Sequence, residues 1–211
     1  MKPWGSRTAL ALVAALGLAG MACSDREEPG AGMAGDGGTP AGGRSPAAPP
    51  AVTIEPGRGA CAGGPNPAIV PGQTSSLSVV SNGRGRTYLL YAPPGYDGTR
   101  PLPLVLNFHG LGSNGEEQHR YSGLVPIAER EGFLVASPDG INRAWLTNPW
   151  VNDIAFTKDL VVEISRLACV DSGRVYATGM SNGGFMSAAL ACAAAAVVAA
   201  VAPVGTVAPA G

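Results

Sequence analysis

The chain has 211 residues, of which 31 are Gly, 19 are Pro and 45% are hydrophobic. Its formal net charge is −1 and its basic residues form no cluster, which argues against a nucleic-acid-binding surface. Charged residues make up only 14% of the chain and His occurs twice, which excludes a coiled coil and a His-rich metal site. We expect neither a metal nor a cofactor.

Residues 1–22 have the anatomy of an export signal. Lys2 and Arg7 precede an apolar stretch over 8–18, and small residues end the segment at Ala22. The stretch is shorter than the roughly 20 residues needed to span a bilayer. Cys23 follows directly and resembles the lipidated first residue of bacterial lipoproteins, although the usual Leu three residues before it is missing. The mature chain is therefore expected outside the cytoplasm, either secreted or attached to a membrane through a lipid on Cys23.

Residues 23–72 are predicted to be a flexible tether, because 12 Gly and 9 Pro fall between 24 and 72 with hardly an aliphatic run among them. A packed α/β domain is predicted over 73–211.

In this domain the hydrophobic pattern alternates between strand and helix periods. The expected strands are 77–80 and 86–91, which form a hairpin, then 103–108, 132–136, 175–178 and 198–202. The expected helices are 124–130, a helix with apolar positions over 160–168 that Asp153 or Thr157 caps, and 183–195. Such units favour a mainly parallel sheet with helices on both faces, introduced by an antiparallel hairpin.

The sequence Gly-Met-Ser-Asn-Gly at 179–183 carries the candidate chemistry. It matches G-x-S-x-G, the pattern of a nucleophile elbow, which is weakly specific alone but here follows a β-branched strand and opens an Ala-rich helix. A sharp turn at this point strains the backbone of Ser181 and exposes its hydroxyl, while Gly179 and Gly183 remove side chains that would collide. Ser181 is therefore the candidate nucleophile. The alternative is a Gly-rich turn with an incidental serine.

His109 and Gly110 directly follow an expected strand. In a serine hydrolase of this layout the loop there supplies an oxyanion donor, so the backbone amides of Leu111 and Asn182 are the expected oxyanion hole, with Gly110 allowing close approach. We expect His109 to support this loop. Its use as general base is the alternative, disfavoured because the base of this fold follows the nucleophile along the chain. His119 lies in a polar segment and is expected to be a solvated helix residue.

Five motifs occur in one order at suitable spacings: Asn-Phe-His-Gly at 107–110, Ser-Pro-Asp-Gly at 137–140, Val-Asn-Asp-Ile-Ala-Phe at 151–156, the elbow block at 174–184 and Ala-Pro-Val-Gly at 202–205. Together they resemble the secreted α/β-hydrolase esterases that include polyhydroxybutyrate depolymerases, feruloyl esterases and acetylxylan esterases. The resemblance implies the α/β-hydrolase fold and a secreted or membrane-anchored serine carboxylesterase. Its substrate would be a polyester or plant-polysaccharide ester, cleaved through an acyl-enzyme on Ser181. An acyltransferase and a non-catalytic surface lipoprotein are the alternatives.

The C-terminal part departs from this resemblance. The triad of the fold runs Ser, then Asp or Glu, then His, but no such residue follows Ser181, and Asp139 and Asp153 both precede it. We therefore expect a domain truncated after its sixth strand, with little or no turnover because the base is absent. The alternative is a complete but inactive protein.

The cysteines give one further expectation. Cys169 precedes the strand that leads to Ser181, and Cys192 lies in the helix that follows. The strand rises about as far as the helix descends, so a Cys169–Cys192 disulfide is predicted, with two buried thiols as the alternative. Cys61 is then left without a partner if Cys23 is lipidated.

Overall fold

The computed structural model describes residues 61, 66–146 and 152–206; the expected export signal, Cys23 and most of the tether lie outside them. The elements in chain order are β1 (Thr74–Ser81), β2 (Arg84–Tyr91), β3 (Leu102–Phe108), α1 (Gly115–Tyr121), α2 (Leu124–Glu131), β4 (Leu134–Pro138), the 3₁₀ turn η3 (Ile141–Arg143), α3 (Asp153–Leu167), β5 (Val170–Met180), α4 (Asn182–Ala193) and β6 (Ala200–Val204).

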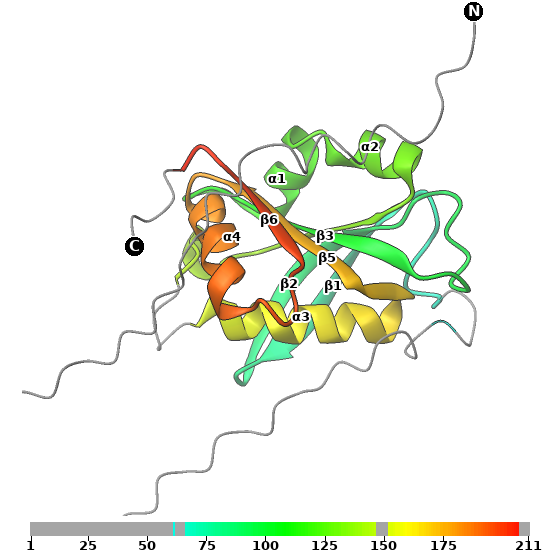
Figure 1. Ribbon diagram of the computed structural model, residues 1–211, viewed down its shortest axis with the longest axis horizontal. Coiled ribbons are helices and arrows are strands. Elements are labelled where there is room, and N and C mark those ends of the chain that lie inside the picture. Colours follow the sequence, from blue (N-terminus) through cyan, green and yellow to red (C-terminus); the bar gives the residue numbers. More distant parts are fainter. Residues whose placement is uncertain (1–60, 62–65, 147–151, 207–211) are drawn as a thin grey trace, which may run out of the picture. The chain divides into compact units, whose positions relative to one another are not determined.

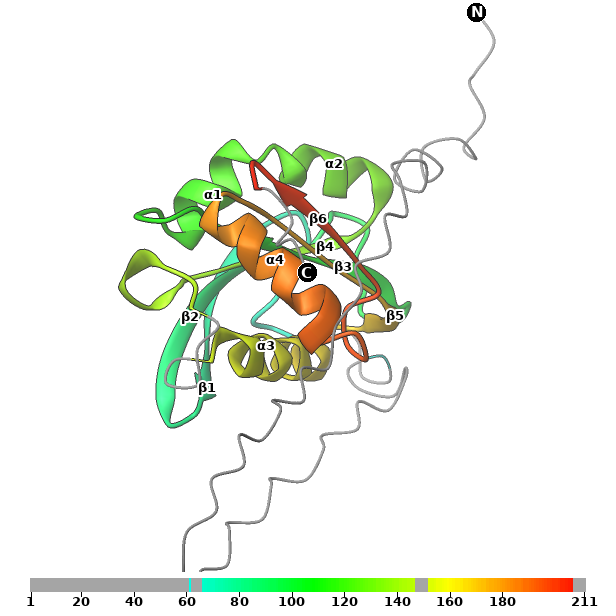
Figure 2. The same cartoon turned by 60° about the vertical axis from the view of Figure 1, so that its left-hand side comes forward.

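The strands form one six-stranded sheet in the order β1-β2-β4-β3-β5-β6. β2 runs antiparallel to both β1 and β4, whereas the pairs β3–β4, β3–β5 and β5–β6 are parallel. Helices α1 and α2 lie on one face, and α3 and α4 lie on the other (Figures 1 and 2). The expected mainly parallel sheet with helices on both faces and an antiparallel hairpin at its start is confirmed.

The core forms where apolar strand residues meet the apolar stripe of α3. In β3 the side chains of Leu104, Leu106 and Phe108 are fully buried at alternate positions, as the two-residue period of a strand requires. Phe156 and Leu160 on α3 are four residues apart and lie on the same helix face, where both are buried. This packing fixes the carboxyl ends of β3 and β5, which carry the candidate site.

The start of α3 differs from the expectation. Asn152 is the N-cap, and its Oδ1 accepts a hydrogen bond from the Ala155 N–H at 2.9 Å. Thr157 is buried inside the helix, where its hydroxyl donates to the Asp153 carbonyl, so neither Asp153 nor Thr157 caps the helix. An Asn at this position satisfies an N–H that the first turn of a helix leaves without a partner.

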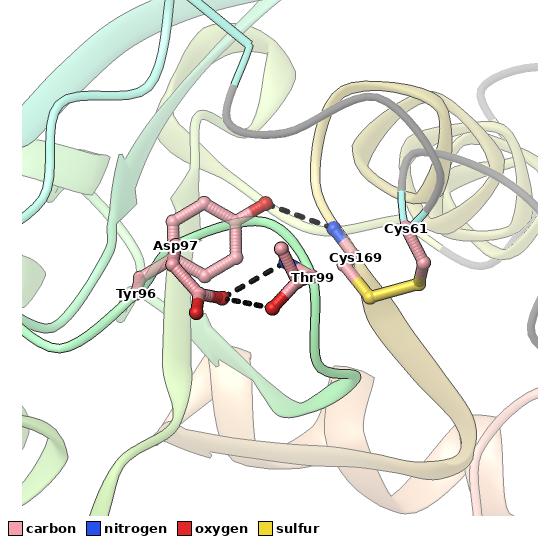
Figure 3. The surroundings of a disulfide bond; sticks show 5 residues. All are labelled: Cys61, Tyr96, Asp97, Thr99 and Cys169. Carbon is pink, nitrogen blue, oxygen red and sulfur yellow. Dashed lines mark hydrogen bonds between the residues drawn. A yellow bond between two sulfur atoms is a disulfide. The ribbon is translucent and has the colours of Figure 1, made fainter.

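The predicted Cys169–Cys192 disulfide is wrong, since Cys169 pairs with Cys61 (Figure 3). Cys169 lies between α3 and β5, where Tyr96 Oη accepts a hydrogen bond from its N–H, and Cys61 packs against the same core cluster. Rise along a strand and a helix gives only the height of two residues, not the side of the sheet to which each side chain points. Cys192 is exposed on α4, and it too has an interaction of its own.

No helix in the described ranges combines the length and apolar character needed to cross a bilayer.

Candidate active site

Ser181 occupies the turn between β5 and α4. Its backbone angles, φ 54° and ψ −115°, lie in a region that side-chain-bearing residues rarely adopt. The Ser181 N–H donates to the Val204 carbonyl of β6 at 2.8 Å, and its own carbonyl accepts the Phe185 N–H as α4 begins. Neighbouring backbone on two sides therefore holds the strained turn. The residue is exposed, which is the arrangement expected of a nucleophile elbow.

The two flanking glycines are required by close backbone packing. A Cβ atom at Gly179 would lie 2.6 Å from the Phe108 carbonyl oxygen, and one at Gly183 would lie 2.1 Å from the same atom. Both distances are far below van der Waals contact, so any other residue would push the elbow away from the end of β3. The missing side chains thus let the start of α4 rest on the strand that leads into the loop at Gly110.

That loop lies directly beside the serine. A Cβ at Gly110 would be 3.8 Å from Ser181 Cβ and 3.5 Å from the Met180 carbonyl oxygen, which is ordinary contact. A larger side chain there would therefore crowd the nucleophile, although a methyl group would fit. Within the described part of the chain, no acceptor is found for the amide of Leu111 or of Asn182. Two such backbone donors next to Ser181 match the arrangement of an oxyanion hole.

His109 is completely buried and both of its ring nitrogens have partners. Its Nε2 accepts the Gly140 N–H at 2.9 Å, and its Nδ1 lies 2.8 Å from the Gly110 carbonyl oxygen. Because an amide can only donate and a carbonyl can only accept, the ring is the neutral tautomer with its proton on Nδ1. Burial also lowers the pKa of His109. The side chain therefore links two loops and has no nitrogen left to take a proton from Ser181.

His119 contradicts the expectation of a solvated residue. Although it lies on α1, it is only partly exposed, with Nε2 2.9 Å from the Thr74 hydroxyl and Nδ1 3.1 Å from the Ser137 hydroxyl. Burial lowers its pKa. The pattern of polar neighbours suggested solvent, but these neighbours form a hydrogen-bonded network between α1 and the sheet that includes Asn107 and Gln118.

Both acidic residues considered as triad members are held by other groups. Asp139 accepts hydrogen bonds from the Gly115 N–H and the Thr87 hydroxyl. Asp153 is fully buried in an ion pair with Arg86, with an Nη2–Oδ1 distance of 2.9 Å. In the residues that the structure describes, no three His, Cys, Asp or Glu side chains come together in a way that could hold a metal ion.

Trp145 belongs to the site but was not expected there. Its backbone N–H donates to Asn182 Oδ1 at 2.7 Å and its carbonyl accepts from Asn182 Nδ2 at 3.1 Å. Its indole N–H donates to the His109 carbonyl at 2.8 Å. The segment between β4 and α3 holds two Trp residues, Trp145 and Trp150, and nothing in their local pattern indicates a partner more than 30 residues away.

Three exposed apolar residues lie in the segments that carry the candidate site. Met180 precedes Ser181, Phe185 lies one helical turn after it, and Leu111 follows Gly110 with 72% of its surface exposed.

The sheet order and the strained serine at the β5–α4 turn are those of the α/β-hydrolase fold. The acetyl xylan esterase of Aspergillus awamori superposes with a TM-score of 0.54 at 20% sequence identity, over 64% of this chain and 53% of that enzyme. The expected α/β-hydrolase fold is therefore confirmed.

Curated relatives indicate which α/β-hydrolases this chain resembles in sequence. Feruloyl esterase D of Neurospora crassa is 33% identical over 140 residues, which are 61% of this chain and 47% of the relative. Feruloyl esterase C of Emericella nidulans is 35% identical over 127 residues, 57% of this chain and 46% of the relative. The resemblance to feruloyl and acetylxylan esterases is confirmed. The chain spans about half the length of the curated relatives it matches, and no protein-family profile matches it.

Proposed function

We propose that this chain belongs to a serine hydrolase that cleaves carboxylic esters through an acyl-enzyme on Ser181. The observation that carries the proposal is the exposed serine in a strained turn, which Gly179 and Gly183 allow to pack against the end of β3. Such strain is retained where it serves a function. The relatives named as feruloyl esterases support the same reaction.

The proposed reaction has two steps. Ser181 Oγ attacks the ester carbonyl carbon, the amides of Leu111 and Asn182 stabilise the oxyanion, and the C–O bond breaks as the serine proton passes to the departing alcohol oxygen. Water then attacks the acyl carbon, its proton returns to Ser181 Oγ as the acyl–serine bond breaks, and the carboxylic acid leaves. The chemistry needs no cofactor.

Neither histidine of the chain is free to accept the Ser181 proton. The chain has two histidines, and in both of them each ring nitrogen already has a partner. Neither can act as the base without breaking these bonds. We therefore expect slow turnover by the 211-residue chain, because an unactivated serine is a weak nucleophile.

The substrate proposed is an ester with an apolar acyl group, such as a feruloyl ester of a plant polysaccharide. The exposed apolar residues Leu111, Met180 and Phe185 in the segments around Ser181 support such a group, and they also suit the hydroxyacyl chain of a polyester. The polymeric nature of the substrate rests on the resemblance to the esterase family.

The proposed location is extracellular or periplasmic, with or without a lipid on Cys23. The Cys61–Cys169 disulfide supports an oxidising compartment. Mass spectrometry of the mature N-terminus tests this: a start at Cys23 with an added lipid mass indicates the anchored form, a start there without it indicates secretion, and retention of Met1 would contradict export.

Chemical rescue tests the activity. The chain and its Ser181→Ala variant are incubated with 4-nitrophenyl ferulate and imidazole, which acts as a diffusible base. We expect imidazole to raise hydrolysis by the chain above that of the variant, and a fluorophosphonate probe to form an adduct at Ser181. Equal rates in both proteins together with no adduct would contradict the proposal and leave a non-catalytic scaffold.

A further inference from the structure

Trp145 connects the two segments that carry the proposed oxyanion donors, the loop after β3 and the start of α4. On one side, its backbone N–H and carbonyl both bond to the side chain of Asn182, at 2.7 and 3.1 Å. On the other side, its indole N–H bonds to the carbonyl of His109, the residue before Gly110, at 2.8 Å. Every polar group of this tryptophan is thus used to join the start of α4 to the loop after β3.

The ring of Trp145 cannot turn freely. It is 3% exposed and packs edge-on against Phe108, with ring centroids 5.0 Å apart and planes at 84°. It also contacts the ring of His109 at 4.8 Å and stacks with Phe156 at 6.4 Å. Aromatic contacts at these distances contribute beyond the area they bury. The indole N–H is therefore fixed in direction as well as in place.

The next residue is fixed to a different element. The Leu146 N–H donates to Asp153 Oδ2 at 2.7 Å, and the Leu146 carbonyl accepts the Asp153 N–H at 3.1 Å. Asp153 in turn is paired with Arg86, whose guanidinium lies 3.8 Å from the centroid of the Phe156 ring. Trp145 is thus tied through Leu146 to the N-terminus of α3 and to β2.

An oxyanion hole works only when its donors are held at the place where the negative charge develops. The two proposed donors, Leu111 in the loop after β3 and Asn182 at the start of α4, are more than 70 residues apart in the sequence, and Trp145 bonds to both segments. We propose that Trp145 is a positioning residue that sets the spacing of the two oxyanion donors, with the Arg86–Asp153 ion pair as its anchor. The catalytic meaning of this proposal rests on the proposed function of Ser181.

The test is Trp145→Phe, which keeps an aromatic ring and removes the indole N–H. Its matched control is Tyr96→Phe. Tyr96 is also 3% exposed, and its hydroxyl accepts the Cys169 N–H at the other end of β5, so each variant removes one buried bond to backbone. Two quantities are measured in the parent chain and in each variant. They are the amide hydrogen exchange in peptides covering 109–113 and 181–185, and the rate at which a fluorophosphonate modifies Ser181.

For Trp145→Phe we expect exchange in both peptides to rise by about tenfold or more, because a local restraint is lost. We expect the modification rate to fall by roughly 10-fold to 100-fold, less than the loss from deleting a donor outright. Tyr96→Phe should change neither quantity by more than about twofold. Asn182→Ala keeps the backbone amide of residue 182 but loses both side-chain bonds to Trp145, so it should raise exchange in the same two peptides.

Unchanged exchange in both Trp145→Phe and Asn182→Ala would overturn the proposal. So would faster exchange with an unchanged modification rate, because the contact would then have no consequence for the reacting serine. If the parent chain does not react with the probe at all, the proposed function fails, whereas the exchange measurement still decides whether Trp145 joins the two segments.

Discussion

Arg86 and Asp153 form an ion pair with an N–O distance of 2.9 Å, and their side chains are 5% and 0% exposed. A second Asp153 oxygen binds the Leu146 N–H, and the Arg86 guanidinium also donates to the Asp139 carbonyl. Both charges are thus satisfied by several hydrogen bonds, as buried charges must be. The pair joins the hairpin to α3 next to the candidate site.

Removing one partner should be costly. We expect Asp153→Ala to lower the free energy of unfolding by about 3–5 kcal/mol, because it leaves the Arg86 charge buried without a counterion. The double substitution Arg86→Met with Asp153→Leu should recover much of this loss. Urea unfolding measures both.

The control is the exposed pair Arg174–Asp171, with side chains 47% and 33% exposed. Arg174→Ala should cost less than about 1 kcal/mol, as is usual for surface ion pairs. Equal losses of unfolding free energy for Asp153→Ala and Arg174→Ala would show that the buried ion pair matters no more to stability than the exposed one.

Gly183→Ala should damage the elbow. Its Cβ would lie 2.1 Å from the Phe108 carbonyl oxygen, which is backbone and cannot move aside cheaply. We expect a loss of at least about 1–3 kcal/mol in unfolding free energy, as for an overpacked core, together with slower modification of Ser181 by a fluorophosphonate. Gly85→Ala is the control, since a Cβ at Gly85 would meet nothing within 4 Å and the change should stay within about 0.5 kcal/mol.

The Cys61–Cys169 disulfide closes a loop with a sequence separation of 108. Cys61→Ser should lower the unfolding free energy by about 2–5 kcal/mol, because a long loop regains freedom in the unfolded chain. Cys169→Ser should cost a similar amount, and the double variant should cost little more than either one. A peptide map of the oxidised protein that joins Cys169 to Cys192 would contradict this pairing.

Acidification should weaken the fold. Burial lowers the pKa values of both His109 and His119, so below about pH 6.5 the unfolded chain binds protons that the folded chain does not. The stabilising contribution is therefore present above that pH and is lost as the pH falls through the lowered values. Urea unfolding between about pH 7.5 and 5.5 measures this. The unfolding free energy of His119→Gln should fall less steeply with falling pH than that of the parent chain. An identical pH dependence would exclude His119 as a contributor.

Local patterns in the sequence predicted much of the fold. The strand before Ser181, the glycines on both sides of it and the helix after it are neighbours in the chain, so the local pattern predicted a sharp turn at this serine. The hairpin and the order of strands and helices were likewise readable from periodicity and turn residues.

Contacts between segments far apart in the chain could not be predicted from the sequence. The partner of Cys169 depends on which way its side chain points from the α3–β5 junction, and the Trp145–Asn182 contact joins segments 37 residues apart. The polar neighbours of His119 suggested solvent because sequence shows which residues are polar but not that they bond to one another. In each case the information lies in the packing of elements, not in their local pattern.

The bonds of Trp145 have a consequence for the order of folding. The strained serine turn rests on Val204 of β6 and on the end of β3, the bonds from Trp145 to Asn182 and His109 span 37 and 36 residues, and the ion pair behind them spans 67. Contacts of high sequence separation form only after the chain has closed long loops. We therefore expect both the strained serine turn and the aligned pair of backbone amides to be completed late in refolding, the turn when β3 and β6 have docked and the amides when the tryptophan docks.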